Sequence, residues 1–208
     1  MLNLNSYRFS PISLPGLSLW MDAADSNTII RSGLNITQWN DKSVNKYNAT
    51  SPSGSNPTLN AGGQNGLNTI TFNGTSQFFT ISNPNALDFG TNDFAIFAAV
   101  QLTLNGSNQG IITKNYGFLP QWRLAMENNQ TQITIYNYSA SFSSVSLGTP
   151  LSGWNFLSGM VYRSSGNVLY INGTGQTAGS VIYGPLNNSV SVLIGVSQVT
   201  PLRFFTGD

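Results

Sequence analysis

Short apolar segments recur along this chain at close intervals, and clusters of Gly, Pro, Asn and Ser separate them. Several of these segments alternate apolar and polar residues, which is typical of β-strands. No stretch of twelve residues shows sustained helical periodicity, so little helix is expected. The expected strands are residues 17–22, 36–41, 69–72, 77–81, 94–104, 110–114, 122–126, 132–138, 154–163, 167–172 and 190–196. At 208 residues, the chain suits one all-β, two-sheet antiparallel sandwich.

Three of these segments carry more specific expectations. Residues 69–72 and 77–81 flank Asn73-Gly74, which predicts a hairpin with a type I′ turn, because both central residues of that turn need a positive φ. Residues 94–104 are apolar on both faces of the expected strand. A strand with two apolar faces is predicted to be central and covered on both sides.

Charge is scarce in this sequence. Charged residues make up 7% of the chain and the net charge is +1, whereas an average domain is about 25% charged. The polar surface must come from uncharged groups, which 26 Asn, 26 Ser and 18 Thr can supply. Because no basic stripe is present, a nucleic-acid partner is not expected. No run of 18 apolar residues indicates a membrane span, and the first twenty residues lack the pattern of a signal peptide.

Five strings in the sequence resemble concanavalin A-like lectin/glucanase domains of the LamG-like jelly-roll type, which occur in phage, giant-virus and bacterial surface proteins. The strings are LSLWMDAAD at 17–25, WNDKS at 39–43 with NAT at 48–50, TFNG at 71–74, LYING at 169–173 and FTGD at 205–208. They stand in the order expected for the family. The resemblance therefore implies a jelly-roll sandwich, and it leaves the ligand open.

The domain organisation follows from the same strings. Residues 1–14 are expected to form an extended lead-in, and residues 15–208 one sandwich domain with surface loops at 51–66 and 173–189. Family members run on through one more strand after a string like that at 205–208. We therefore expect this last strand beyond Asp208, or a partner that covers the exposed sheet edge.

Catalysis by acid–base or nucleophilic side chains is not expected. The chain has no His and no Cys, and Glu127 is its single Glu. Glycoside hydrolysis needs two carboxyl groups that flank the scissile bond, and the family's glucanases carry them on an E-x-D-x-x-E strand that is missing here. A hydrolytic serine would need a neighbouring base, and Lys42 next to Ser43 would face the other side of a strand.

Three early carboxylates are candidates for a calcium site. Asp22, Asp25 and Asp41 could supply oxygen ligands if the two loops that carry them converge. The alternative is that these carboxylates cap turns or pair with Lys42 and Arg31.

Tyrosines, one tryptophan and neighbouring amides are candidates for a glycan-binding site, because an aromatic ring can stack on a sugar while amides bind its hydroxyls. The candidates are Tyr116, Trp122, Tyr136, Tyr138 and Tyr183, with Asn115, Asn128 and Asn137 nearby. The alternative is that these rings pack in the core.

Two functions are consistent with these features. The first is a non-enzymatic structural or surface module of a virus or phage particle, such as a fibre, tail-associated or capsid-decorating protein, with glycan-binding capacity. It would sit on the particle surface and contact other virion or surface protein subunits in an oligomer or lattice. The alternative is a soluble carbohydrate-binding, lectin-like domain of a cell-surface or secreted protein.

Overall fold

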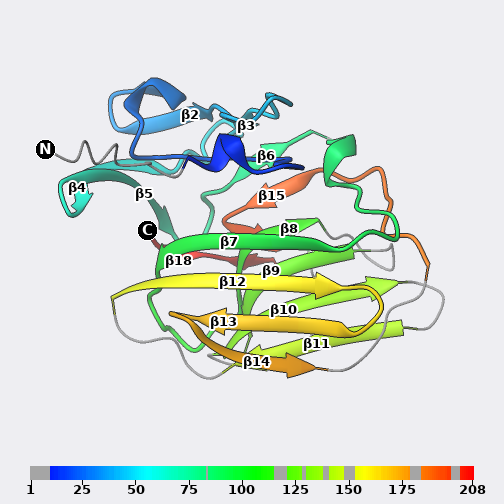
Figure 1. The fold of residues 1–208 in the computed structure, drawn as a ribbon. Coiled ribbons are helices and arrows are strands. Elements are labelled where there is room, and N and C mark those ends of the chain that lie inside the picture. Colours follow the sequence, from blue (N-terminus) through cyan, green and yellow to red (C-terminus); the bar gives the residue numbers. More distant parts are fainter. Residues whose placement is uncertain are drawn as a thin grey trace, which may run out of the picture.

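The computed structural model is built of antiparallel β-sheets, and the two largest face each other across a hydrophobic core (Figure 1). This arrangement is an all-β sandwich of the jelly-roll kind, as the strand pattern and the resemblance predict. The structure describes residues 10–82, 84–114, 121–127, 130–137, 141–147, 153–178, 184–197 and 202–208. It gives the backbone alone for residues 121, 130–137, 141–147 and 176–178.

The larger sheet has twelve strands within the described residues. Their order is β11-β10-β9-β8-β15-β6-β3-β2-β4-β5-β18, and β1 pairs with β2 beside this path. The bounds are β1 Ile29–Ser32, β2 Asn35–Trp39, β3 Ala49–Thr50, β4 Thr58–Gln64, β5 Leu67–Asn73, β6 Phe79–Ile81, β8 Gln109–Lys114, β9 Gln121–Glu127, β10 Gln130–Asn137, β11 Ser141–Leu147, β15 Val192–Ile194 and β18 Thr206–Gly207. The strands expected at 36–41, 110–114, 122–126 and 132–138 are therefore confirmed as β2, β8, β9 and β10.

The smaller sheet has the order β14-β13-β12-β7 and lies in front of β8–β11 in Figure 1. Its strands are β7 Phe94–Gln101, β12 Trp154–Tyr162, β13 Gly166–Ile171 and β14 Thr174–Ala178. A third, two-stranded sheet consists of β16 Val196–Ser197 and β17 Arg203–Phe204. The helices are single 3-10 turns, η1 Pro11–Ser13, η2 Ser26–Thr28 and η3 Asn85–Leu87. In the part of the chain described here, no helix has the length and apolar character needed to cross a membrane.

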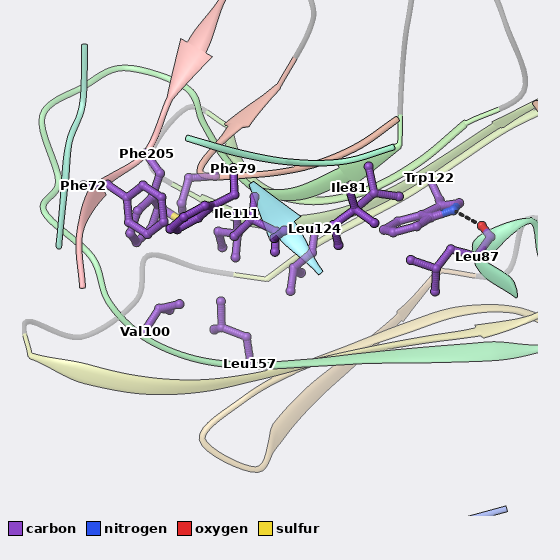
Figure 2. Packing of buried hydrophobic residues seen from close by; sticks show 14 of the residues in the cluster. Phe72, Phe79, Ile81, Leu87, Val100, Ile111, Trp122, Leu124, Leu157 and Phe205 are labelled. Carbon is purple, nitrogen blue, oxygen red and sulfur yellow. Dashed lines mark hydrogen bonds between the residues drawn. The ribbon is translucent and has the colours of Figure 1, made fainter. Parts of the chain in front are cut away.

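The core lies between the two sheets because alternate residues of each strand point inward (Figure 2). Trp122, Leu124 and Met126 do so from β9 in the larger sheet. Leu157 and Val161 do so from β12 in the smaller one. Aromatic rings fill one end of this layer, where Phe72 meets both Phe79 and Phe205 edge to face, at centroid distances of 5.9 and 5.6 Å. Such tilted ring pairs add to the stabilisation that comes from burial.

The segment around η3 closes the other end of the core. The Leu87 side chain is buried, and its carbonyl oxygen accepts a hydrogen bond from the Trp122 indole N–H at 3.1 Å (Figure 2). The next residue, Asp88, binds the ammonium group of Lys114 at 2.6 Å and accepts the backbone N–H of Asn188. Lys114 is fully buried, so this carboxylate neutralises a charge that has no access to water.

The hairpin predicted at Asn73-Gly74 is wrong. Strand β5 pairs with β4 and β18, whereas β6 pairs with β15 and β3. Instead of forming a two-residue turn, the Asn73 side-chain oxygen accepts the backbone N–H groups of Thr75, Ser76 and Gln77 and so organises a wider loop. The two Asn residues that do adopt a positive φ before glycine are Asn65, between β4 and β5, and Asn172, between β13 and β14.

Three other expectations also differ from the structure. Residues 17–22 form no strand but make a single bridge, Met21 to Asp41. The Trp20 carbonyl accepts a hydrogen bond from the backbone N–H of Lys42, whereas the Trp20 N–H donates to the Asp41 side chain and not to another strand. The loops expected at 51–66 and 173–189 contain strands β4 and β14, respectively. The tight turn at Asn65-Gly66 links β4 to its partner β5.

Strand β7 lies at an edge of the smaller sheet, so the prediction that it is central and covered on both sides is wrong. Its inward residues, such as Ile96 and Val100, pack in or against the core, but Ala95, Phe97 and Ala99 are exposed on the outer face. Only the end of β7 meets the C-terminal segment, where Gln101 and Asp208 exchange two backbone hydrogen bonds. Beyond that point, no described residue pairs with the free edge.

Candidate functional site

Asp22 and Asp25, two of the three carboxylates predicted to bind calcium, lie on either side of a lysine. The Lys42 ammonium group is 2.9 Å from Asp22 Oδ2 and 2.8 Å from Asp25 Oδ2, and it also lies 4.3 Å from the centre of the Trp20 ring. The hydrogen bond from Lys42 lowers the pKa of Asp25, and the bonds to Asp25 and Asp22 raise the pKa of Lys42. The cation between the two carboxylates is therefore the lysine, as the alternative interpretation holds.

The third carboxylate, Asp41, is 2% exposed and organises the neighbouring turn. Its Oδ1 accepts the backbone N–H groups of Trp20 and Ser43, and its Oδ2 accepts the Ser43 hydroxyl and the backbone N–H of Tyr47. These four bonds lie at 2.6–2.9 Å and leave little acceptor capacity for a metal ion. Across the described ranges, no three acidic, His or Cys side chains form a group that could hold one.

Trp122, the one predicted glycan-binding aromatic whose side chain is described, belongs to the core. It is 1% exposed and packs against Phe89 and Phe94. Since its ring offers no face to solvent, the prediction that it binds a sugar is wrong. The sequence carried a signal for this burial, because Trp122 alternates with Gln121 and Arg123 and so shares the apolar face of β9 with Leu124 and Met126.

The other glycan-binding candidates stay predictions. Tyr136 and Asn137 lie in β10, where the backbone alone is described, with Tyr136 opposite Gln121 and Phe142. The remaining candidates, Asn115, Tyr116, Asn128, Tyr138 and Tyr183, lie outside the described residues.

Glu127, the single glutamate, is held between two cations on the outer face of the larger sheet. Its Oε1 accepts from the guanidinium groups of Arg123 and Arg203. Burial lowers the pKa of Arg123, and the nearby Glu127 charge opposes that shift. A glutamate oxygen that accepts from two guanidinium groups is suited to a structural ion pair.

A shallow pocket of about 480 Å³ lies on the outer face of the larger sheet, and we call it the Phe78 pocket. Thr80 of β6 and Leu193 of β15 form its floor, and they sit directly opposite each other in the paired strands. Thr80 points outward because its neighbours Phe79 and Ile81 point into the core. The lining residues are Pro52, Phe78, Thr80, Ser189, Val190, Ser191 and Leu193.

The Phe78 pocket combines an aromatic ring with hydroxyl groups. The Phe78 ring, which lies 6.3 Å from that of Phe204, forms one wall, and Thr80, Ser189 and Ser191 bring hydroxyls. None of its lining residues is charged. An open pocket with one ring and several hydroxyls can stack on an apolar sugar face and bind the sugar's hydroxyls.

A second hollow, of about 430 Å³, has no aromatic residue in its lining. It is formed by Ile12, Leu14, Gly16, Leu17, Ser18, Val44, Asn45 and Ala86. Most of these side chains are apolar, so this hollow offers few groups that could orient a polar ligand.

The Phe78 pocket was missed at the sequence level because its parts lie far apart in the chain. The hairpin predicted at Asn73-Gly74 placed residues 77–81 beside β5, and not beside β15. The available signal was the alternation of Phe78 and Thr80 against Phe79 and Ile81, which assigns the first pair to the outer face.

Comparison with known proteins shows the fold and not a family. No family model matches the chain, and no curated protein matches it by sequence. Among solved structures, the chain is similar to the binding domain of Paraclostridial Mosquitocidal Protein 1, with a TM-score of 0.66 and 13% sequence identity. The match covers 93% of this chain and 45% of that chain. It is also similar to mouse laminin α1 chain domains LG4-5, with a TM-score of 0.52, 12% identity, and coverages of 66% and 38%.

A third similar structure is that of botulinum neurotoxin type C, which depends on an interaction with two ganglioside molecules to enter cells. The TM-score is 0.55 and the identity 14%, and the match covers 93% of this chain and 44% of that chain. The chain therefore spans about half the length of these neurotoxin and mosquitocidal structures. At such low identity the likeness extends to the sandwich fold alone.

Proposed function

We propose that the protein is a non-enzymatic binding module that holds a carbohydrate in the Phe78 pocket. The observation that carries the proposal is the pairing of the Phe78 ring with the hydroxyls of Thr80, Ser189 and Ser191 on an open outer face. Its volume, about 480 Å³, lies within the usual range of small-ligand sites. A shallow pocket open to water suits one or two terminal sugar units.

No charged residue lines the Phe78 pocket, which favours an uncharged ligand over a charged one. The ring of Phe204 lies next to that of Phe78, and the residue before it, Arg203, carries a positive charge. That arginine is already paired with Glu127. A neutral sugar unit therefore fits the lining better than a carboxylated or sulfated one, which would lack a counter-charge. Because no ion pair would form, the affinity should change little between about 0.05 and 0.5 M salt.

The similar structures support the ligand class, and the pocket supports its location. The ganglioside interaction belongs to botulinum neurotoxin type C, and less than half of that chain is matched. The non-enzymatic character is supported by the chemistry of this chain, since it has no His or Cys and its single Glu is bound to two arginines.

A structural role on the surface of a virus or phage particle is the second candidate. It is favoured by the exposed, uncharged edge and outer face of the smaller sheet around Phe97 and Phe156, because large exposed apolar surfaces often mark contacts between proteins. The two roles are compatible, since a surface subunit can also bind glycans. A lectin-like domain of a cell-surface or secreted protein would use the same pocket without the particle.

The test is a screen of immobilised glycans, followed by calorimetric titration of the strongest neutral ligand. Phe78→Ala should weaken that binding by more than about tenfold, the equivalent of one lost stacking contact of about 1.4 kcal/mol. Phe156→Ala is the matched control, because this phenylalanine is exposed on the smaller sheet. The proposal fails if no glycan binds, or if both variants bind like the unmodified protein.

A further inference from the structure

The chain contains four asparagine–glycine pairs, which begin at Asn65, Asn73, Asn105 and Asn172. Such a pair is prone to lose ammonia from the asparagine side chain, because glycine has no side chain that shields its backbone nitrogen and its backbone reorients easily. In all four pairs the glycine N–H donates no hydrogen bond to a described residue. The attacking nitrogen is therefore equally free in each pair, and a difference in reactivity must come from the asparagine side chain and its surroundings.

Asn65 and Asn172 have the same backbone geometry, because each begins a two-residue turn between paired strands. Their φ angles are 49° and 51°, and those of the glycines that follow are 77° and 83°. The residues that flank each turn pair directly with one another. Both glycines also have open space around them. The two sites are therefore a matched comparison in which the asparagine side chain is what differs.

The side-chain amide of Asn172 is held at both ends, and that of Asn65 is not. Asn172 Oδ1 accepts the backbone N–H of Phe156 at 2.8 Å, and Asn172 Nδ2 donates to Asn155 Oδ1 at 3.0 Å. The Asn65 side chain is exposed and makes no hydrogen bond to a described residue. Bringing the Asn172 amide to the next nitrogen breaks two hydrogen bonds, whereas the Asn65 amide turns through its rotamers without such a loss.

The amides of Asn73 and Asn105 are held as well. Asn73 Oδ1 accepts three backbone N–H groups, and Asn73 Nδ2 donates to a serine hydroxyl in the same loop. Asn105 Oδ1 accepts the backbone N–H of Ser107, and Asn105 Nδ2 donates to the Thr206 hydroxyl. Among the four pairs, Asn65 is therefore the asparagine whose amide no described residue restrains.

The strands behind the Asn65 turn are also less regularly paired. The register of β4 and β5 is interrupted between Asn60 and Gln64, so a single pair, Gln64 with Leu67, closes the turn. Behind Asn172, the register of β13 and β14 runs without interruption over five pairs. The reaction requires the turn to leave its native shape briefly, and a turn that one pair closes beyond a bulge opens at a lower cost in free energy.

We propose that Asn65 is a site of spontaneous deamidation. The Gly66 backbone nitrogen attacks Asn65 Cγ, the Cγ–Nδ2 bond breaks, and the amide group leaves as ammonia with the proton of the Gly66 nitrogen. Water then opens the cyclic succinimide at either carbonyl, which gives aspartate or isoaspartate. Both products add a carboxylate and lower the formal net charge of +1 by one unit. The Phe78 pocket contains neither residue in its lining, so the modification leaves the proposed glycan binding unchanged.

The test is to incubate the folded protein at mildly alkaline pH and to locate each converted amide by tandem mass spectrometry. Asn65 should react at least about tenfold faster than Asn172, the equivalent of about 1.4 kcal/mol in the barrier. The control is the same incubation in guanidinium chloride. There all four pairs should react at similar rates, because glycine follows each asparagine and the fold no longer restrains the amides.

The comparison of folded and unfolded protein decides the outcome. Equal rates at Asn65 and Asn172 in the folded protein overturn the proposal, as does a faster reaction at Asn73 or Asn105. If folding slows Asn65 as strongly as it slows Asn172, the proposal is also overturned, because the turn itself would then protect the amide. Asn65→Gln verifies the location of the fast reaction, since its longer side chain would have to close a larger ring and the signal should disappear.

Discussion

The outer faces of the two sheets differ in their content of charged residues and in their exposure to solvent. On the larger sheet, Glu127 joins Arg123 and Arg203, and strands β16 and β17 lie over part of β8. On the smaller sheet, the outward positions of β7 and β12 hold Ala, Phe, Gln, Trp, Ser, Met and Tyr, and the rings of Phe97 and Phe156 are half exposed.

This difference indicates separate tasks for the two faces. On the larger sheet, strands β16 and β17 cover part of the charged outer face. The uncharged Phe78 pocket stays open on the same face. A bare apolar face has no internal partner in the described part of the chain. The proposed ligand site therefore lies on the larger sheet, and the outer face of the smaller sheet is the surface that the second candidate function would use.

The largest effect on stability is expected from Glu127→Gln. The variant leaves Arg123, which is 12% exposed at its side chain, without a counter-charge, and a buried charge that has lost its partner costs about 3 kcal/mol. Chemical unfolding in urea would measure the loss. Asp25→Asn, which removes a carboxylate from an exposed pair, should change the midpoint far less. Equal effects at the two positions would show that the larger sheet's outer face is not specially dependent on its ion pairs.

An intermediate effect is expected from Gly175→Ala on the outer face of the smaller sheet. A Cβ atom at this glycine would lie 2.4 Å from the Tyr170 ring, so the ring must move, at a cost of about 1–2 kcal/mol. In a Tyr170→Ala background the same substitution should cost almost nothing, and this double-mutant cycle measures the contact itself. A full penalty in that background would place the strain in the backbone instead.

A small effect is expected from Phe156→Thr. Because about half of this side chain is already exposed, and threonine suits a strand, the free energy of unfolding should change by less than about 0.5 kcal/mol at low protein concentration. Thermal unfolding would measure it. A loss well above 1 kcal/mol would mean that the outer face of the smaller sheet is packed like a core.

The smallest effect concerns pH and the Lys42 cluster. The pKa of Asp25 is lowered in the folded chain, so its contribution is present above the unfolded value and disappears as the pH falls through the lowered one. The pKa of Lys42 is raised, so its contribution is present at neutral pH and is lost only at strongly alkaline pH. The difference in urea midpoint between the unmodified protein and Lys42→Met should be constant near neutrality and shrink below about pH 4. A difference that grows in acid would contradict these pairings.

Local sequence patterns predicted the individual strands well, but they did not predict which strands lie side by side in a sheet. The alternation at 36–41 and the apolar run at 154–163 correspond to β2 and β12, because side-chain direction depends on two-residue periodicity alone. The position of β7 at an edge depends on which strands lie beside it, and nothing local to FAIFAAVQ encodes that.

Turns and site residues also separate into features that local sequence encodes and features that depend on distant parts of the chain. The Asn-Gly pairs at Asn65 and Asn172 do form tight turns with a positive φ at both residues. At Asn73-Gly74, the Asn73 side chain accepts hydrogen bonds from three backbone N–H groups instead. Pairing of Asp22 and Asp25 with Lys42 was foreseeable from charge. The Phe78 pocket was not, because Pro52, Thr80 and Ser191 meet only after the strands have paired.

The most direct test of the account is to map the binding site by amide chemical shifts while a neutral glycan is titrated into the labelled protein. The account predicts that the perturbed amides gather at Phe78, Thr80 and Ser191, and that those of β7 stay unchanged. Perturbations that gather on β7 or β10, or none with any glycan, would contradict it.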